Sequence, residues 1–349
     1  MSEPIDTRPL YRRALAAAYV YSVKTVRRAR KNVKRIRRHL YSRGRYTRPG
    51  RALLAMSSLI ASPRSAFERR RTVVAYNRQF PSTQLNHTDG YAMLPAGSLP
   101  GTSEVVSACL KLFEEKKRQI EGPASSGATP TAKKWAFLRS VLTNDDLEKH
   151  PELLDFALSD GLLSLVTNYL NTIPHLNRID LLYSVAHGGD EVVSSQMFHL
   201  DPEGLRQAKL FLNLRDVGPD EGPFTFIPAS ESTRIVKSIR AQRQADGELA
   251  MARYLDREIA QVGGLDKAIG TMGPPGSAAL VDTSRCLHFG SRVKPGTYRL
   301  CLYIQYCSSP EHGNRFDVNR HRADPVRYLA LVGSQRSAPA DVSAPHQMG

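Results

Sequence analysis

The sequence predicts a mainly β domain with flanking helices and a basic helical extension at its N-terminus. Beyond Arg178 the sequence pattern predicts short strands separated by turns. Before that point, residues 145–171 carry apolar side chains at helical spacing, with a break near Asp160 and Gly161. The third observation is that positive charge is concentrated near the N-terminus.

Charge divides the chain into two unlike parts. The first 80 residues contain 21 of the 49 Lys and Arg residues, with only Glu3, Asp6 and Glu68 as acids. The remaining chain has 28 basic and 30 acidic residues, so the formal net charge of +16 belongs to the N-terminal part. With 349 residues, of which 41% are hydrophobic, the chain is long enough to bury a sizeable core.

Residues 11–40 are predicted to form the basic helix. They contain no Gly or Pro, and apolar residues recur at steps of three and four between Tyr19 and Leu40, which places them on one helical face. Arg and Lys cover most of the remaining surface. Such a helix can lie on an anionic membrane, dock on its own domain or a partner, or bind nucleic-acid phosphates, and the sequence leaves these alternatives open.

Composition suggests the domain boundaries. The stretch GPASSGATPTAK at residues 122–133 is typical of a flexible linker, and a helix is expected just before it. We therefore expect residues 1–102 to form a basic helical and irregular extension and residues 103–133 a helix with a linker. Residues 134–332 would form the β domain, and residues 333–349 a disordered tail.

The cysteines favour a reducing compartment, and the hydropathy argues against a membrane span. Cys109, Cys286, Cys301 and Cys307 form no CxxC pair and have no zinc-ligand spacing, which argues against a disulfide framework. No stretch reaches the roughly 18 apolar residues that a membrane span needs. We expect a cytoplasmic protein, peripheral to the inner face of a membrane if the basic helix binds lipid.

The strand region contains the residues that suggest chemistry. His199 and Asp201 lie in QMFHLDPEG, and a strand places residues i and i+2 on the same side, so the imidazole and the carboxylate can point into one cavity. A strand, KLFLNLRDV, a turn, GPDEG, and a second strand, PFTFIP, follow. Lys209 and Asn213 on the first of these strands are weaker candidates for lining the site, since a solvated face explains them equally well.

The same spacing occurs twice more, without that context. His87 and Asp89 run into an Asp-Gly turn, and His150 and Glu152 stand in a helical pattern with a proline between them. Short motifs of this kind are prone to false positives, so the strand and hairpin beside His199 carry the distinction.

A second histidine and an arginine follow on later strands. ALVDTSRCLHF delivers His288, and YRLCLYIQY places Arg299 on the same face as Cys301, Tyr303 and Gln305. Two imidazoles and one carboxylate form the facial triad of non-haem Fe(II) enzymes. An inward arginine needs a carboxylate to pair with, and a co-substrate acid would suit it.

The order of these elements resembles the phytanoyl-CoA dioxygenase family of iron(II)- and 2-oxoglutarate-dependent oxygenases. The matching features are HxD, a strand beginning with Lys, a Gly-Pro turn, an Ile-Pro-x-Ser end, a distal His, and an Arg eleven residues after it. They cover roughly residues 150–310. The resemblance implies that the β domain is a double-stranded β-helix, a jelly roll related to cupins.

The resemblance also implies a role for each site residue. His199, Asp201 and His288 would be the Fe(II) ligands, Arg299 would bind the distal carboxylate of 2-oxoglutarate, and Gln196 would contact the same co-substrate. The implied reaction hydroxylates an unactivated C–H bond of a small-molecule or lipid-like substrate, with succinate and CO₂ as co-products. Asp201 favours hydroxylation over halogenation, because halogenating relatives lack that carboxylate.

The chain departs from the family pattern at two positions that are not metal ligands in the resemblance, so we expect substrate recognition to differ rather than iron binding. The family usually has Pro-Gly-Ser-His where this chain has Pro228-Ala229-Ser230-Glu231, and Arg292 replaces an asparagine common after the distal histidine. Two alternative functions stay open. One is a membrane-surface enzyme that modifies a cell-envelope lipid or glycolipid, and the other is a catalytically idle protein that binds nucleic acid or phosphate.

Overall fold

The structure is a computed structural model that describes residues 63–120, 137–186, 192–201, 206–246, 253–309 and 316–332. The fold below belongs to the compact unit that begins at Arg64. The predictions for the basic helix at 11–40, the linker at 122–133 and the tail at 333–349 lie outside the described residues.

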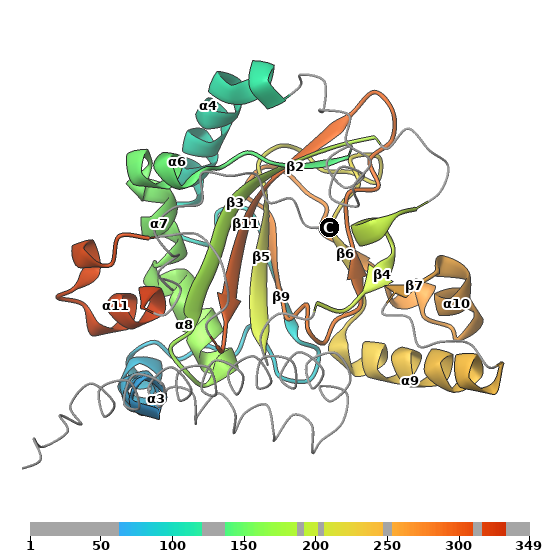
Figure 1. The fold of residues 1–349 in the computed structure, drawn as a ribbon, viewed down its shortest axis with the longest axis horizontal. Helices are drawn as coiled ribbons and strands as arrows, with labels where there is room; N and C mark the ends of the chain where they lie inside the picture. The colour runs from blue at the N-terminus through green and yellow to red at the C-terminus, as the bar shows by residue number, and fades with distance from the viewer. Residues whose placement is uncertain are drawn as a thin grey trace, which may run out of the picture. The chain divides into compact units, whose positions relative to one another are not determined.

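Antiparallel strands form two sheets (Figure 1). The larger sheet has the order β1-β9-β5-β11-β3-β2, and the smaller has the order β7-β4-β10-β6-β8. The strands of the larger sheet are β1 (Tyr91–Leu94), β2 (Leu138–Ser140), β3 (His175–Val185), β5 (Gln207–Asn213), β9 (Ala278–Val281) and β11 (Tyr298–Cys307). Those of the smaller sheet are β4 (Phe198–His199), β6 (Thr225–Phe226), β7 (Arg253–Tyr254), β8 (Ile269–Gly270) and β10 (His288–Phe289).

The chain changes sheet repeatedly between β3 and β11. Strands β3, β5, β9 and β11 belong to the larger sheet, whereas β4, β6, β8 and β10 belong to the smaller one. This alternation brings residues that are far apart in the sequence into direct register, and His288 on β10 pairs with His199 on β4.

Helices flank the sheets. Figure 1 shows α4, α7 and α8 beside the larger sheet and α9 and α10 near the smaller one. The helices and 3₁₀ turns are α3 (Pro63–Gln79), α4 (Thr102–Ile120), α6 (Asn144–Lys149), α7 (Pro151–Ala157), α8 (Asp160–Leu170), η2 (Ser194–Gln196), α9 (Ala229–Ala245), α10 (Asp256–Gln261), η3 (Leu265–Lys267), η4 (Asn319–His321) and α11 (Pro325–Leu331). No helix among these residues is long and apolar enough to cross a membrane.

The side chains of β5 contribute to two hydrophobic clusters, one on each face of the larger sheet. Leu210 and Leu212 belong to the cluster that also contains α8 residues such as Leu162 and Val166. Phe211, between the two leucines, belongs instead to a smaller cluster with Phe224 and Phe226. Successive strand residues point to opposite faces, so a fully buried strand of this kind supports helices on one side and a second sheet on the other.

Two elements within the range expected to be an N-terminal extension, residues 1–102, are described by the structure. They are α3 and β1, in the compact unit that begins at Arg64. β1 pairs with β9 along its whole length, from Tyr91 to Leu94. A segment of four residues forms a strand only when it pairs with the edge of a sheet, and the residues of that edge lie far along the chain.

The helical stretch before the strands also differs in detail. The expected pair of helices within residues 145–171 is three helices, α6, α7 and α8. Pro151 begins α7 as its first residue, where the missing N–H costs nothing, and the Ser159 hydroxyl caps α8.

Candidate metal centre

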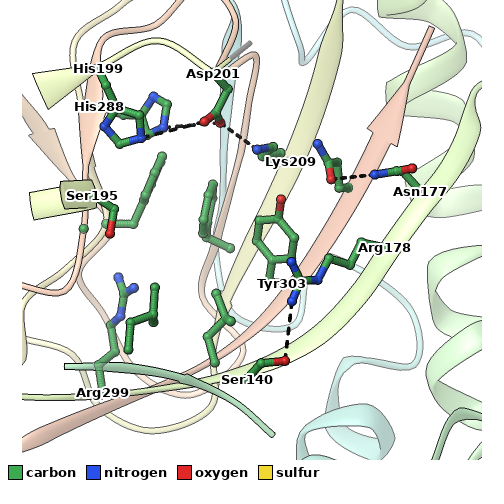
Figure 2. Close-up of a pocket in the computed structure, with 16 residues that line it drawn as sticks. Ser140, Asn177, Arg178, Ser195, His199, Asp201, Lys209, His288, Arg299 and Tyr303 are labelled. Atoms are coloured by element: carbon green, nitrogen blue, oxygen red, sulfur yellow. Dashed lines mark hydrogen bonds and ion pairs between the residues drawn. The ribbon is translucent and has the colours of Figure 1, made fainter. Parts of the chain in front are cut away.

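His199, Asp201 and His288 lie together, as the sequence analysis predicts. One ligand atom from each lies within 4.8 Å of the others, and no other such group of His, Cys, Asp or Glu occurs among the residues that the structure describes. His199 Nε2 is 3.7 Å from Asp201 Oδ1, and His288 Nε2 is 3.4 Å from Asp201 Oδ2 (Figure 2). The lookalike pairs at His87 and His150 are not part of any such cluster.

Backbone carbonyls set the orientation of both imidazoles. His199 Nδ1 lies 2.8 Å from the Met197 carbonyl oxygen, and His288 Nδ1 lies 3.0 Å from that of Cys286. A carbonyl only accepts hydrogen bonds, so each Nδ1 carries the proton. The lone pair of each Nε2 is then available to a cation, which is the arrangement in which a second hydrogen bond fixes a metal-binding histidine.

The electrostatics of the triad favour its metal-binding protonation states. Burial, together with the neighbouring His288, lowers the pKa of His199 to about 3. Burial alone would raise the pKa of Asp201, but Lys209 and His288 outweigh it and hold that pKa well below its usual range. Near neutral pH, His199 is therefore neutral and Asp201 is a carboxylate.

Lys209 contacts this carboxylate directly. Its Nζ lies 2.6 Å from Asp201 Oδ2, and both side chains are largely buried. The sequence made Lys209 and Asn213 equally weak candidates, but the structure separates them. Asn213 Nδ2 donates to the Thr271 carbonyl oxygen at 3.2 Å, and Asn213 does not line the cavity next to the triad.

That cavity has a volume of about 410 Å³ and contains the triad in its wall. Its lining comes mainly from the strands of the larger sheet on one side and from β10 and the residues around β4 on the other. Figure 2 shows His199, His288 and Asp201 at one part of this cavity and Arg299 at another. The volume falls within the range usual for small-molecule sites, roughly 300–1,000 Å³.

Arg299 is buried in the cavity wall without a hydrogen-bond partner for its Nε among the described residues. Burial lowers the pKa of this guanidinium. Gly290 lies opposite, and a Cβ at that position would lie 3.6 Å from Arg299 Nη2. A buried guanidinium is costly unless an acceptor compensates it, so the residue is suited to a carboxylate that enters the cavity.

Gln196 does not have the expected position. Its Nε2 donates to the Ser291 carbonyl oxygen at 2.9 Å, its Oε1 accepts from the Val193 N–H at 3.1 Å, and it does not line the cavity. The amide therefore holds two backbone segments together beside the site. Ser195, its neighbour, lines the cavity instead, because residues 194–196 form a 3₁₀ turn rather than a strand.

Arg292, one of the two departures from the family pattern, forms hydrogen bonds and an ion pair with neighbouring segments. Its Nε donates to the Gln196 carbonyl oxygen at 2.8 Å, and its two terminal nitrogens bind the Asp256 carboxylate at 2.7 and 2.8 Å. The guanidinium also lies over the Phe289 ring, 3.5 Å from its centroid. This residue links α10 to the segments that carry the triad histidines.

Three further residues of the cavity wall have no counterpart in the sequence analysis. Ser140 on β2 and Asn177 and Arg178 on β3 line the cavity. Nothing in their local sequence distinguishes them from ordinary strand residues. Their place follows from the pairing of β2 and β3 with the rest of the larger sheet.

Comparison with known proteins gives only distant structural likenesses. No protein-family model matches the chain, and no curated protein does. The epimerase SnoN, in complex with Fe³⁺, alpha-ketoglutarate and nogalamycin RO, is 12% identical over 68% of this chain and 83% of its own, with a TM-score of 0.39. EctD from S. alaskensis with bound Fe is 15% identical over 68% and 79%, with a TM-score of 0.42.

A third solved structure is similar to the same degree. HygX from Streptomyces hygroscopicus, with nickel and 2-oxoglutarate bound, is 16% identical over 66% of this chain and 86% of its own, with a TM-score of 0.40. These identities and TM-scores are too low for the proteins to assign a family or an activity to this chain.

Proposed function

We propose that this protein is an iron(II)- and 2-oxoglutarate-dependent oxygenase with a double-stranded β-helix. The observation that carries the proposal is the presence, in one cavity, of a histidine–aspartate–histidine cluster and a buried arginine whose Nε has no protein partner among the described residues. The repeated change of sheet between β3 and β11 supports the jelly-roll assignment.

The triad fits an iron ion. Two imidazoles whose Nδ1 atoms are bound to backbone carbonyls offer Nε2, and one carboxylate, kept ionised by Lys209, offers an oxygen. Three protein ligands of this kind leave coordination positions for other molecules. The donor set suits Fe(II) better than a structural zinc site, which prefers four protein ligands and often thiolates, whereas no cysteine belongs to this cluster.

Arg299 fits the distal carboxylate of 2-oxoglutarate. Its guanidinium is held in the cavity wall, and a bidentate carboxylate would satisfy donors that the described residues leave unpaired. Iron, 2-oxoglutarate and dioxygen together would supply the oxidising chemistry: one oxygen atom of dioxygen would enter the substrate and the other succinate, with CO₂ released from 2-oxoglutarate. The protein would contribute the orientation of the co-substrate, a largely buried site, and a carboxylate position that is occupied by Asp201 and so favours hydroxylation.

The test is iron binding by the full-length protein. His199→Ala and His288→Ala should each abolish stoichiometric Fe(II) binding and the formation of succinate from 2-oxoglutarate, because each removes one of three ligands. His150→Ala is a matched control, because this imidazole pairs with Glu152 outside the cavity, and the variant should bind iron like the wild type. Unchanged iron content in both triad variants would remove the assignment.

A further inference from the structure

We propose that the substrate of this site carries a carboxylate and that Arg178 recognises it. The inference rests on the proposed function, because it concerns the molecule that is oxidised rather than the co-substrate. Arg178 and Arg299 both line the cavity (Figure 2). In the register of β3 with β11, Arg178 pairs with Gln305, six residues along the strand from Arg299. At about 3.3 Å per residue, the two arginine backbones lie on the order of 20 Å apart.

A β-bulge directs Arg178 and its neighbour into the cavity. Gln305 pairs with Arg178 but Tyr306 pairs with Leu176, so Asn177 is an extra residue in β3. In a regular strand Asn177 and Arg178 would point to opposite faces. Both line the cavity here, and bulges often redirect side chains in this way next to active sites.

The Arg178 side chain is held in place but retains unused donors. Its Nη2 forms an ion pair with Asp180 and donates to Ser140 Oγ at 3.4 Å. Asp180 is buried and also accepts from Ser140 Oγ–H at 2.7 Å. Nε and Nη1 of Arg178 have no hydrogen bond to the residues that the structure describes, and the side chain is 45% exposed. A guanidinium fixed through one nitrogen presents its other edge to a ligand with little further loss of side-chain entropy.

The charges around the cavity favour an anion. Lys209 is paired with Asp201, and Arg178 with Asp180, which leaves the charge of Arg299. A dication at the triad and a 2-oxoglutarate dianion would cancel, so the loaded cavity keeps a net charge of about one positive unit. A substrate with one carboxylate balances that charge, whereas a cationic substrate would add to it.

A purely structural role for Arg178 makes a different prediction. Asp180 is a buried carboxylate, so Arg178 stabilises the fold whatever else it does, and Arg178→Gln alone would leave that acid without a cation, with only hydrogen-bond partners such as Ser140. The double variant Arg178→Gln/Asp180→Asn removes both charges and leaves no buried acid. If Arg178 only neutralises Asp180, the double variant should handle substrate normally. If it recognises substrate, the double variant should lose that ability.

Arg320 offers a matched control. It is 44% exposed and pairs with Asp155 through Nη2 at 2.6 Å, but it does not line the cavity. Arg320→Gln/Asp155→Asn therefore removes an ion pair whose arginine is as exposed as Arg178, and whose acid, unlike Asp180, is also exposed.

The experiment uses small molecules extracted from the cells that make the protein. The extract is separated on an anion-exchange resin at neutral pH, and each pool is added to full-length, iron-loaded protein with 2-oxoglutarate. We expect the retained pool, and not the unretained pool, to raise succinate formation and to yield a product heavier by one oxygen. Amidation of the carboxylates in the retained pool should abolish the effect, whereas phosphatase treatment should not.

The variants are then compared with the active pool. The double variant at Arg178 and Asp180 should need at least roughly 10-fold more of the active pool for half-maximal stimulation of succinate formation, because a charge-assisted contact is lost. Arg178→Lys/Asp180→Asn, which returns a cation without the planar fork, should restore part of that loss. The control at Arg320 and Asp155 should match the wild type. A second readout needs no turnover: the pool should raise the melting temperature of the nickel- and 2-oxoglutarate-loaded wild type and control, but not that of the Arg178 double variant.

The outcomes separate the inference from the proposed function. Stimulation by the unretained pool, loss of stimulation after phosphatase, or a wild-type response of the Arg178 double variant would overturn the carboxylate assignment and leave the oxygenase intact. If no pool raises succinate formation and the His199→Ala protein still binds iron, the proposed function fails, and the inference fails with it.

Discussion

Two buried arginines of this protein have opposite surroundings. Arg69 on α3 and Arg299 on β11 are each 3% exposed. Arg69 donates to the carbonyl oxygens of Ile173, Pro174 and Val332, at 2.9, 3.0 and 2.7 Å, and also to that of Leu329. Arg299 Nε has no partner among the described residues. One guanidinium is satisfied by the fold, and the other lies in the wall of a cavity.

The difference shows two ways in which a buried guanidinium can be compensated, by acceptors of the fold or by a ligand. Removing a guanidinium from water is unfavourable unless acceptors replace the water, and burial lowers the pKa of Arg69 to about 9. Carbonyl groups at the start of β3 and the end of α11 compensate this cost, so Arg69 connects three elements. For Arg299 the protein supplies no such set, and a bound carboxylate would complete it.

Arg69→Leu should have the largest effect on the stability of the fold. It leaves several buried carbonyls without donors, and each unsatisfied group typically costs about 1–3 kcal/mol, so we expect a loss of about 3–5 kcal/mol in the free energy of unfolding. Urea denaturation of the metal-free protein measures it. A loss below about 1 kcal/mol would mean that water replaces the guanidinium at little cost.

Arg299→Leu should show the converse pattern. Because the fold offers Nε no acceptor, we expect the unfolding free energy to stay unchanged or to rise slightly without ligand. The affinity for 2-oxoglutarate should fall by about 2–5 kcal/mol, or roughly 30- to 4,000-fold, with Fe(II) binding retained. Calorimetric titration of 2-oxoglutarate into the nickel-loaded protein checks this. Wild-type affinity in the variant would show that another cation binds the co-substrate.

Arg299→Lys sharpens the same comparison. Lysine restores the charge without the planar pair of donors, so we expect only partial recovery of 2-oxoglutarate affinity. The same titration measures it. Full recovery would indicate a contact that depends on charge alone.

The smallest expected effect is a pH dependence at the Arg69 cluster. His175 Nδ1 lies 3.0 Å from Arg69 Nη2, and burial together with Arg69 holds the pKa of His175 well below its usual range. The unfolded chain takes up a proton near pH 6.5 that the folded protein does not. Stability from this group is therefore present above about pH 6.5 and lost as the pH falls, by at most about 1.4 kcal/mol per pH unit.

His175→Gln isolates this contribution. Urea denaturation between pH 7.5 and 5 should give a smaller loss of stability in the variant than in the wild type. His199 contributes a loss of the same sign in both proteins, so only the difference between their slopes is informative. Parallel slopes would show that His175 can be protonated in the folded state.

Much of the site could be predicted because its residues occupy local patterns. His199 and Asp201 are separated by one residue next to a hairpin, and His288 and Arg299 lie on short strands bounded by turns. Period-two alternation predicts which of these side chains share a face. The structure accordingly brings the triad and Arg299 to one cavity.

Other features could not be predicted, because they depend on pairing between distant segments. Residues 194–196 form a 3₁₀ turn rather than a strand, and the Gln196 amide binds backbone at Val193 and Ser291, so its contact with the co-substrate stays a prediction. Arg69 looks like any basic residue of a surface helix until the residues before β3 and at the end of α11 supply its acceptors. No local signal marks β1 as a sheet strand, because β9 provides the edge that it joins.

The sequence alone determined the chemistry that is available: two imidazoles, a carboxylate and an arginine at spacings that strands can bring together. Only the tertiary structure decided which charged groups are already paired and which still have donors to offer. Arg69 and Arg178 are the same residue type as Arg299, but no local pattern distinguishes them. The register of β3 with β11, with one bulge at Asn177, decides that Arg178 lines the cavity, because the direction of a side chain follows from the pairing of its strand.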